Sequence, residues 1–228
     1  MVQKIMQNRD KKLLTQGINL MGIQLPASAI DPLCRYFDEL CKWNKKINLV
    51  ARAGEKEIIE KHFLDSLTLL PFMQKQAKNK WLDVGSGGGF PGLVVKICCP
   101  QLDLTLVEPR RKKVTFMKHV IRTLGLQQVE VREARLEAGD QTLFNGQTFL
   151  IISSRALSKV SDFLDLSQSF SPPGGKVICM KGLRAEEELA DWREKRPDSP
   201  YDLVEKTEWR LPFSGGKRVV LIFEKTTH

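Results

Sequence analysis

A glycine-rich stretch over residues 81–92, WLDVGSGGGFPG, carries the residues best suited to bind a ligand. Its first residues are apolar and predict a short buried strand. The glycines that follow, among them Gly85 and Gly87, can adopt positive φ angles and let a ligand approach the bare backbone. Pro91 suits the first turn of a helix. A strand, a glycine loop and a helix in this order are typical of the first unit of a nucleotide-binding α/β sheet.

Asp83, just before the loop, helps to choose between two classes of ligand. The spacing Gly87-x-Gly89-x-x-Gly92 matches a dinucleotide-binding fingerprint, but the pyrophosphate of NAD would meet the like charge of Asp83. S-adenosylmethionine carries an ammonium and a sulfonium, which a carboxylate attracts. A unit-charge pair about 4 Å apart is worth roughly 4 kcal/mol at an effective dielectric near 20, before desolvation. The sequence therefore favours S-adenosylmethionine. The alternative is that Asp83 hydrogen-bonds only the amides of the loop itself.

Polar residues also end the next strands along the chain. A strand over 102–108 ends in Glu108, which could accept both ribose hydroxyls of an adenosine ligand. NAD and S-adenosylmethionine share that ribose, so Glu108 does not separate them. No G-x-x-x-x-G-K-[ST] motif is present, which excludes a P-loop.

A central, nearly apolar strand over 149–155 ends in Ser153, Ser154 and Arg155, which we expect to face the ligand crevice. Arg155 could pair with the ligand carboxylate, or form a salt bridge to Asp83 or Glu137. A fifth strand over 176–182 brings Lys181 to the same edge, where it could reach an RNA phosphate or the target base.

The alternation of strand and helix patterns over 81–228 predicts a doubly wound, Rossmann-like α/β domain. Its third strand, over 128–132, leads to Leu136 and Glu137, expected beside the adenine edge. Segments 201–211 and 217–224 suit a terminal antiparallel pair. Together these segments predict a seven-stranded, mostly parallel sheet flanked by helices.

Residues 1–73 predict an N-terminal helical extension, and 74–80 a polar connector. We expect a helix over 4–21, a second helix with Asp31 as its N-cap and Pro32 at its first helical position, and a third over 57–70. In the last of these, His62 and Asp65 share a face because they lie three residues apart. Segment 43–49, WNKKINL, is equally compatible with a helix end and with a polar surface that faces RNA.

The formal net charge of +9 is compatible with a nucleic-acid partner. A run of four cations, Arg110, Arg111, Lys112 and Lys113, opens a predicted helix and opposes its dipole there. This unfavourable placement points to a functional basic patch, although a solvated helix face is the common explanation of a charge run.

Composition limits which metal sites, cellular compartments and membrane segments we expect. The five cysteines and three histidines lack zinc-site spacing, so we expect no metal. Free thiols fit a reducing cytoplasm. We find no apolar run long enough to span a membrane and no secretory signal, so we expect a cytoplasmic protein without a membrane partner.

Several of these segments together resemble the bacterial small-subunit (16S) ribosomal RNA guanine-N7 methyltransferase family, RsmG, also called glucose-inhibited division protein B (GidB). The matching segments are 43–49, 62–67 (HFLDSL), 83–92, 112–113, 154–156 and 181–182. The glycine loop alone would indicate only an S-adenosylmethionine enzyme, whereas the two N-terminal motifs make the resemblance specific.

The resemblance implies a class I methyltransferase fold that binds S-adenosylmethionine and methylates one guanine of 16S rRNA, free or in the small ribosomal subunit. Matched by motif, its cofactor contacts fall on Gly85, Phe90, Leu136, Glu137 and Arg155. Glu108 stands where many members have aspartate. Arg155 and Lys181 are candidates for positioning the substrate, and His62 joins the four cations as a candidate RNA contact. We expect a monomer. Two alternatives are an NAD-dependent oxidoreductase and a non-catalytic RNA-binding or ribosome-assembly module.

Overall fold

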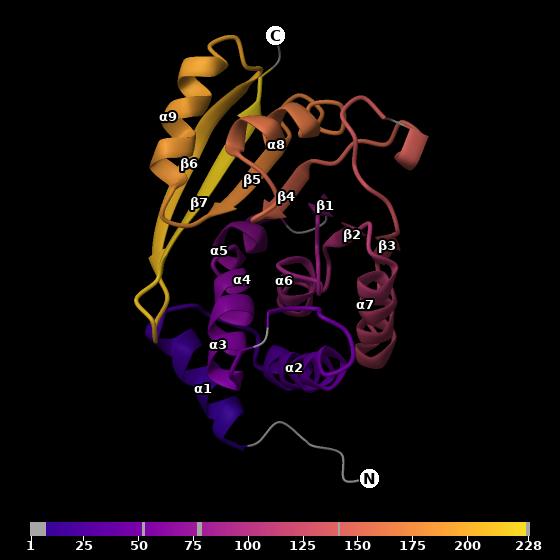
Figure 1. Ribbon diagram of the computed structural model, residues 1–228, viewed down its shortest axis with the longest axis vertical. Helices are drawn as coiled ribbons and strands as arrows, with labels where there is room; N and C mark the ends of the chain where they lie inside the picture. Colours follow the sequence, from indigo (N-terminus) through magenta and orange to yellow (C-terminus); the bar gives the residue numbers. More distant parts are fainter. Residues whose placement is uncertain (1–7, 52, 77–78, 141, 227–228) are drawn as a thin grey trace.

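The computed structural model describes residues 8–51, 53–76, 79–140 and 142–226. Its centre is a seven-stranded sheet in the order β3-β2-β1-β4-β5-β7-β6 (Figure 1). The strands are β1 Lys80–Val84, β2 Asp103–Val107, β3 Val129–Arg132, β4 Ile151–Arg155, β5 Lys176–Lys181, β6 Tyr201–Arg210 and β7 Lys217–Lys225. The first five are parallel, and β7 pairs antiparallel with both β5 and β6. The predicted sheet and its terminal antiparallel pair are confirmed.

The helices lie before and between these strands. They are α1 Asn8–Leu20, α2 Ile30–Asn44, α3 Glu55–Ile58, α4 Asp65–Leu67, α5 Leu70–Met73, α6 Gly92–Cys98, α7 Arg111–Leu124, α8 Val160–Ser167 and α9 Ala185–Lys195. A π-helical segment, Ile59–Leu64, joins α3 to α4. Short 3-10 turns occupy Ala27–Ala29, Gln74–Gln76 and Thr142–Phe144. None of the helices in the described part of the chain is long and apolar enough to cross a membrane.

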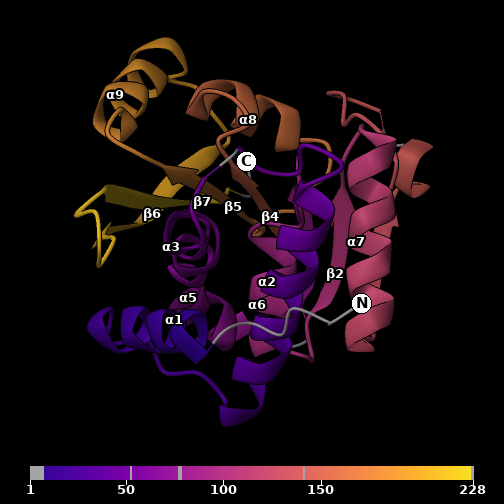
Figure 2. The ribbon, with the colours of Figure 1, turned by 60° about the horizontal axis from the view of Figure 1, so that its bottom comes forward.

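Helices cover both faces of the sheet (Figure 2). The helices α8 and α9 pack on one face through a core that includes Phe163 and Trp192. On the other face, α6 and α7 share a single apolar core with α1 to α5. Within that core, Leu14 of α1 and Leu33 of α2 join Leu104 of β2. The N-terminal helices are therefore part of the sheet's core packing, and the division into an extension and a domain stays a prediction.

Two helix predictions need correction. The second helix begins at Ile30, after a 3-10 turn, so Asp31 lies in its first turn and is not its N-cap. The helix predicted over 57–70 is interrupted by the π-helical segment. Hydrophobic periodicity reports which face of a helix is buried, and it does not detect a local change in hydrogen-bond spacing. The first predicted helix is confirmed from Asn8 onward, and its start at residue 4 lies outside the described residues.

The shared core predicts how truncation in α1 affects stability. Leu14 is fully buried, whereas Leu20 of the same helix is 63% exposed. We expect Leu14→Ala to lower the free energy of unfolding by about 2–5 kcal/mol within a single cooperative transition, and Leu20→Ala to change it by less than about 0.5 kcal/mol. Urea unfolding followed by circular dichroism measures both. Two separate transitions, or equal losses in the two variants, would contradict a common core.

Candidate functional site

The candidate site lies at the carboxyl ends of β1, β2, β4 and β5. The chain order reverses between β1 and β4, because β2 and β3 lie to one side of β1 while β4 and β5 lie to the other. In an open parallel sheet, the crevice beside such a reversal is where ligands bind. The register places Asp83 of β1 beside Ser153 of β4.

The glycine loop is shaped by backbone that only glycine adopts readily. Gly85, Gly87 and Gly89 have φ angles of 70°, 60° and 97°. A Cβ atom on Gly85 would lie 2.8 Å from Cδ1 of Leu157, and one on Gly89 would lie 2.7 Å from the Tyr36 hydroxyl. Side chains at these positions would be strained and would also collide with their neighbours. The loop therefore presents bare backbone, as the sequence predicts.

Asp83 holds this loop from beneath. Its carboxylate accepts hydrogen bonds from the Ser153 hydroxyl at 2.7 Å and from the Gly92 amide at 3.2 Å. The side chain is fully buried, and this burial raises the pKa of Asp83 to about 6. The direct contact with a cationic ligand predicted for Asp83 is therefore corrected to the alternative, in which the carboxylate bonds the loop. The prediction that Ser153 faces the crevice is wrong, because Ser153 is buried and also accepts from Trp81 Nε1 at 2.9 Å.

Glu108 braces the opposite side of the loop. Its Oε2 accepts the Gly87 amide at 3.0 Å, and its Oε1 accepts the Arg110 amide at 3.0 Å. The residue is almost completely buried, yet each carboxylate oxygen has a second lone pair that can accept a further hydrogen bond. Glu108 thus occupies the predicted place at the end of β2, next to the loop.

Arg155 joins the crevice to the N-terminal helices. Its Nη1 donates to Asp65 Oδ2 at 3.1 Å and to the Lys61 carbonyl at 2.7 Å. The other oxygen of Asp65 accepts from Arg218 Nε of β7 at 3.0 Å. The alternative considered for Arg155, a salt bridge to Asp83 or Glu137, is not what the structure shows, because its carboxylate partner is Asp65 of α4. A buried carboxylate with two guanidinium partners is strongly constrained in position.

His62 and Phe90 complete this junction. His62 Nδ1 lies 3.0 Å from Arg155 Nη2, and the imidazole packs on the Phe90 ring at 5.1 Å between centroids. Burial, followed by the nearby charges of Arg155 and Lys61, lowers the pKa of His62 to about 3. A neutral imidazole can accept the arginine hydrogen bond. The predicted shared face of His62 and Asp65 is confirmed, and His62 serves this junction instead of facing an open RNA-binding surface.

An aromatic cluster fixes Phe90 over the loop. Its ring stacks on Tyr36 of α2 at 5.3 Å and meets the edge of Phe63 at 5.3 Å. The Tyr36 hydroxyl donates to the Gly88 carbonyl at 2.5 Å, and the Arg155 guanidinium lies 5.4 Å from the Phe90 ring centre. The loop is thus held by side chains from α2 as well as by the two carboxylates.

The other predicted site residues are distributed around the crevice. Leu136 is buried in the core beside α8, and Glu137 is exposed. Lys181 is almost completely buried, where it donates to the Ser158 carbonyl and pairs with Glu188 Oε2 at 2.8 Å. The predicted RNA contact of Lys181 is therefore wrong, since a buried ammonium requires partners within the protein.

The basic run at the start of α7 is accessible. Arg110, Arg111 and Lys112 are exposed, and Lys113 is half-buried. A Cβ atom on Gly87 would lie 3.7 Å from Lys113 Nζ, so this ammonium lies beside the glycine loop. The run therefore extends from the crevice onto the surface.

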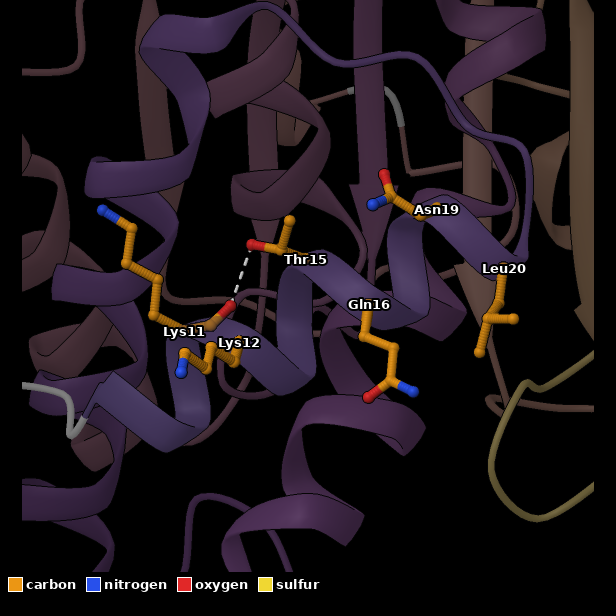
Figure 3. Close-up of a pocket in the computed structure, with 6 residues that line it drawn as sticks. All are labelled: Lys11, Lys12, Thr15, Gln16, Asn19 and Leu20. Atoms are coloured by element: carbon orange, nitrogen blue, oxygen red, sulfur yellow. Dashed lines mark hydrogen bonds between the residues drawn. The ribbon is translucent and has the colours of Figure 1, made fainter.

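A surface pocket along α1 is separate from these residues (Figure 3). Its lining residues are Lys11, Lys12, Thr15, Gln16, Asn19 and Leu20. All of them belong to one helix, and the Thr15 hydroxyl donates back to the Lys11 carbonyl at 2.9 Å. None is among the predicted site residues, so this pocket contributes nothing to the crevice at the sheet. Among the described residues, no group of three or more His, Cys, Asp or Glu side chains could hold a metal ion.

Sequence reasoning missed two residues of the site. Tyr36 and Arg218 approach the loop and Asp65 from α2 and β7, far away in the chain. No local motif marks either of them. The only available signal was the His62-x-x-Asp65 spacing, which indicated that a partner should face both side chains.

The shifted pKa values of Asp83 and His62 predict opposite effects of pH on the free energy of unfolding. Asp83 has a folded pKa above its ordinary value of 3.8, so its stabilising contribution is present at low pH and is lost as pH rises from about 4 to 6. His62 has a folded pKa below 6.5, so its contribution is lost as pH falls below about 6.5.

We therefore expect Asp83→Asn to gain stability relative to the wild type as pH rises from 4 to 6. We expect His62→Gln to gain relative to the wild type as pH falls from 6.5 to 4.5. Each slope is at most about 1.4 kcal/mol per pH unit. Urea titrations of the three proteins at half-unit pH intervals measure the differences, and flat difference curves would refute the assignment.

This chain is similar to known proteins over most of its length. The family model described as rRNA small subunit methyltransferase G matches residues 29–201. A protein of Desulfotalea psychrophila named "Ribosomal RNA small subunit methyltransferase G" is 43% identical over 210 residues, which cover 92% of this chain and 95% of the relative. One of the same name from Myxococcus xanthus is 38% identical, with 93% and 95% coverage.

Among solved structures, a putative O-methyltransferase from Klebsiella pneumoniae is similar over 96% of this chain and 100% of its own, with 15% identity and a TM-score of 0.63. This likeness concerns the fold. The family model and the full-length relatives are more specific, and they show that the chain belongs to the rRNA small subunit methyltransferase G family.

Proposed function

We propose that this protein transfers a methyl group from S-adenosylmethionine to N7 of one guanine in 16S rRNA. Full-length relatives named for methylation of small-subunit ribosomal RNA are the observation that carries the proposal. The crevice agrees with it, because a bare glycine loop and an acid at the end of β2 lie beside an exposed basic run.

The residues of the crevice suit S-adenosylmethionine. The positive φ angles of Gly85 and Gly87 leave backbone that a ligand can approach. Glu108 has lone pairs to accept ribose hydroxyls, and Arg155 can attract the ligand carboxylate. Asp83 acts through the loop that it holds, while Phe90, Leu136 and Glu137 are the proposed neighbours of the cofactor. When bound, this cofactor supplies a methyl group on a sulfonium that leaves as a neutral thioether.

The chemistry demands alignment more than proton transfer. Guanine N7 carries an in-plane lone pair at neutral pH, so no general base has to activate it. The protein must hold N7 in line with the methyl carbon, and positioning of this kind can lower a barrier by roughly 7–11 kcal/mol. A loop held by Asp83, Glu108 and Tyr36 is suited to that task, because its amides are fixed before the ligand arrives.

The exposed cations Arg110, Arg111 and Lys112, with Lys113 at the loop, are the proposed contacts to RNA phosphate. Phosphate contacts of this kind make RNA affinity fall steeply with salt. A target base inside a stack would have to be flipped into the crevice. We further propose that the protein acts as a cytoplasmic monomer on the RNA or on the small subunit.

Gly85 provides a direct test of the cofactor site. We expect Gly85→Asp to abolish S-adenosylmethionine binding in isothermal titration calorimetry, because the new side chain would collide with Leu157 and place a carboxylate in the loop. Gly125→Asp is the matched control, since Gly125 has a similar φ of 64° but a Cβ atom there would meet no neighbour within 4 Å. Unchanged affinity in Gly85→Asp would remove the loop from the site.

Nucleoside mass spectrometry tests the reaction itself. We expect 16S rRNA from cells that lack this protein to lose one 7-methylguanosine, and the purified protein to restore it in vitro with S-adenosylmethionine. The Gly85→Asp variant should restore nothing. An unchanged 7-methylguanosine content would overturn the substrate, and RNA binding without any methyl transfer would favour a non-catalytic module.

A further inference from the structure

Two leucines are exposed at the rim of the crevice. Leu183 is 84% exposed and Leu157 is 43% exposed, although both are large apolar side chains. Leu157 follows the carboxyl end of β4, and Leu183 follows the carboxyl end of the adjacent strand β5. Exposed apolar side chains gathered at a functional edge mark a contact surface more often than scattered ones do.

The two loops that carry these leucines are tied together. Lys181 donates to the carbonyl of Ser158, the residue after Leu157, and pairs with Glu188. The same Glu188 oxygen accepts the amide of Val160 at 3.1 Å. Lys181 and Glu188 thus tie the loop after β4, which carries Leu157, to the end of β5, just before Leu183.

The backbone just before Leu157 has an unfavourable conformation of the kind found at ligand sites. Ala156 has a φ of 53°, in the left-handed region that non-glycine residues rarely adopt. Alanine has no polar side chain to stabilise this conformation locally, so the surrounding contacts must impose it. Strained residues of this kind gather at ligand sites. Here the strain places Leu157 against Gly85 of the glycine loop.

The glycine loop and the two leucines follow three neighbouring strands. The glycine loop follows β1, Leu157 follows β4 and Leu183 follows β5, and these three strands are neighbours in the sheet. A group that packs on Leu157 would lie next to the glycine loop, because the Leu157 side chain lies against Gly85. Exposed charged residues lie close to each leucine in the chain, Lys159 near Leu157 and Arg184 next to Leu183.

We infer that Leu157 and Leu183 form an apolar platform for the ring face of the purine that is methylated. This inference rests on the proposed function. Flipped bases are held between aromatic or apolar side chains, and leucine can pack on a purine face without occupying its hydrogen-bonding edges. The platform therefore leaves N7 free, and it positions a purine without distinguishing guanine from adenine.

The test compares three exposed leucines. Leu157→Ser, Leu183→Ser and the double variant remove the platform. Leu150→Ser is the matched control, because Leu150 is 44% exposed and lies just before β4, at the opposite end of that strand. Methyl transfer to 16S rRNA from cells lacking the protein gives kcat and KM for RNA, and calorimetry gives the affinity for S-adenosylmethionine.

We expect each platform variant to lower kcat/KM for RNA about tenfold, and the double variant more, because each removes apolar burial on the order of one leucine side chain. S-adenosylmethionine affinity and melting temperature should stay within error of the wild type, and Leu183→Met should restore most of the activity. The control should behave as the wild type does.

Three results would overturn the inference. Unchanged kcat/KM for RNA in the double variant would show that the leucines touch no substrate. A loss of S-adenosylmethionine affinity that accounts for the whole effect would show that they cover the cofactor. If the wild type transfers no methyl group to RNA, the proposed function fails and the platform fails with it, whereas the first two results leave the proposed function intact.

Discussion

The site depends on one buried carboxylate, Asp65, which accepts from two arginines. Arg155 approaches it from the end of β4 and Arg218 from β7. Removing a buried carboxylate from water is unfavourable unless cationic partners compensate, so the three side chains constrain one another. This interaction also joins three parts of the chain that are far apart in sequence. It fixes the guanidinium of Arg155 above Phe90, at the crevice.

The glycine loop obtains its shape from groups beneath and beside it. Asp83 and Glu108 accept amides of the loop, and Tyr36 donates to one of its carbonyls. Backbone groups fixed in this way need not reorganise when a ligand binds, which is the general advantage of a preorganised polar site. The raised pKa of Asp83 reflects its burial, a penalty that the hydrogen bonds from Ser153 and Gly92 only partly offset.

The sheet could be predicted from sequence because its central strands contain short, buried apolar segments, such as Val177 to Met180 of β5. The glycine loop could be predicted because its spacing is local. The direction of individual side chains could not. Asp83, Ser153 and Lys181 lie toward the carboxyl ends of their strands, yet all three are buried and find partners on neighbouring strands, loops or helices. Position at a strand end therefore predicts the neighbourhood of a polar residue and does not predict whether it faces a ligand.

Side chains from the N-terminal helices contact the residues of the candidate site. His62 and Asp65 meet Arg155, while Tyr36 and Phe63 hold Phe90. The motif over 43–49 plays a different part, since Asn44 Oδ1 accepts the amides of Leu49 and Val50 and so closes the turn after α2. The two N-terminal motifs that made the family resemblance specific thus differ in role. The motif over 62–67 contacts Arg155 and Phe90 directly, whereas the motif over 43–49 orders the turn that follows α2.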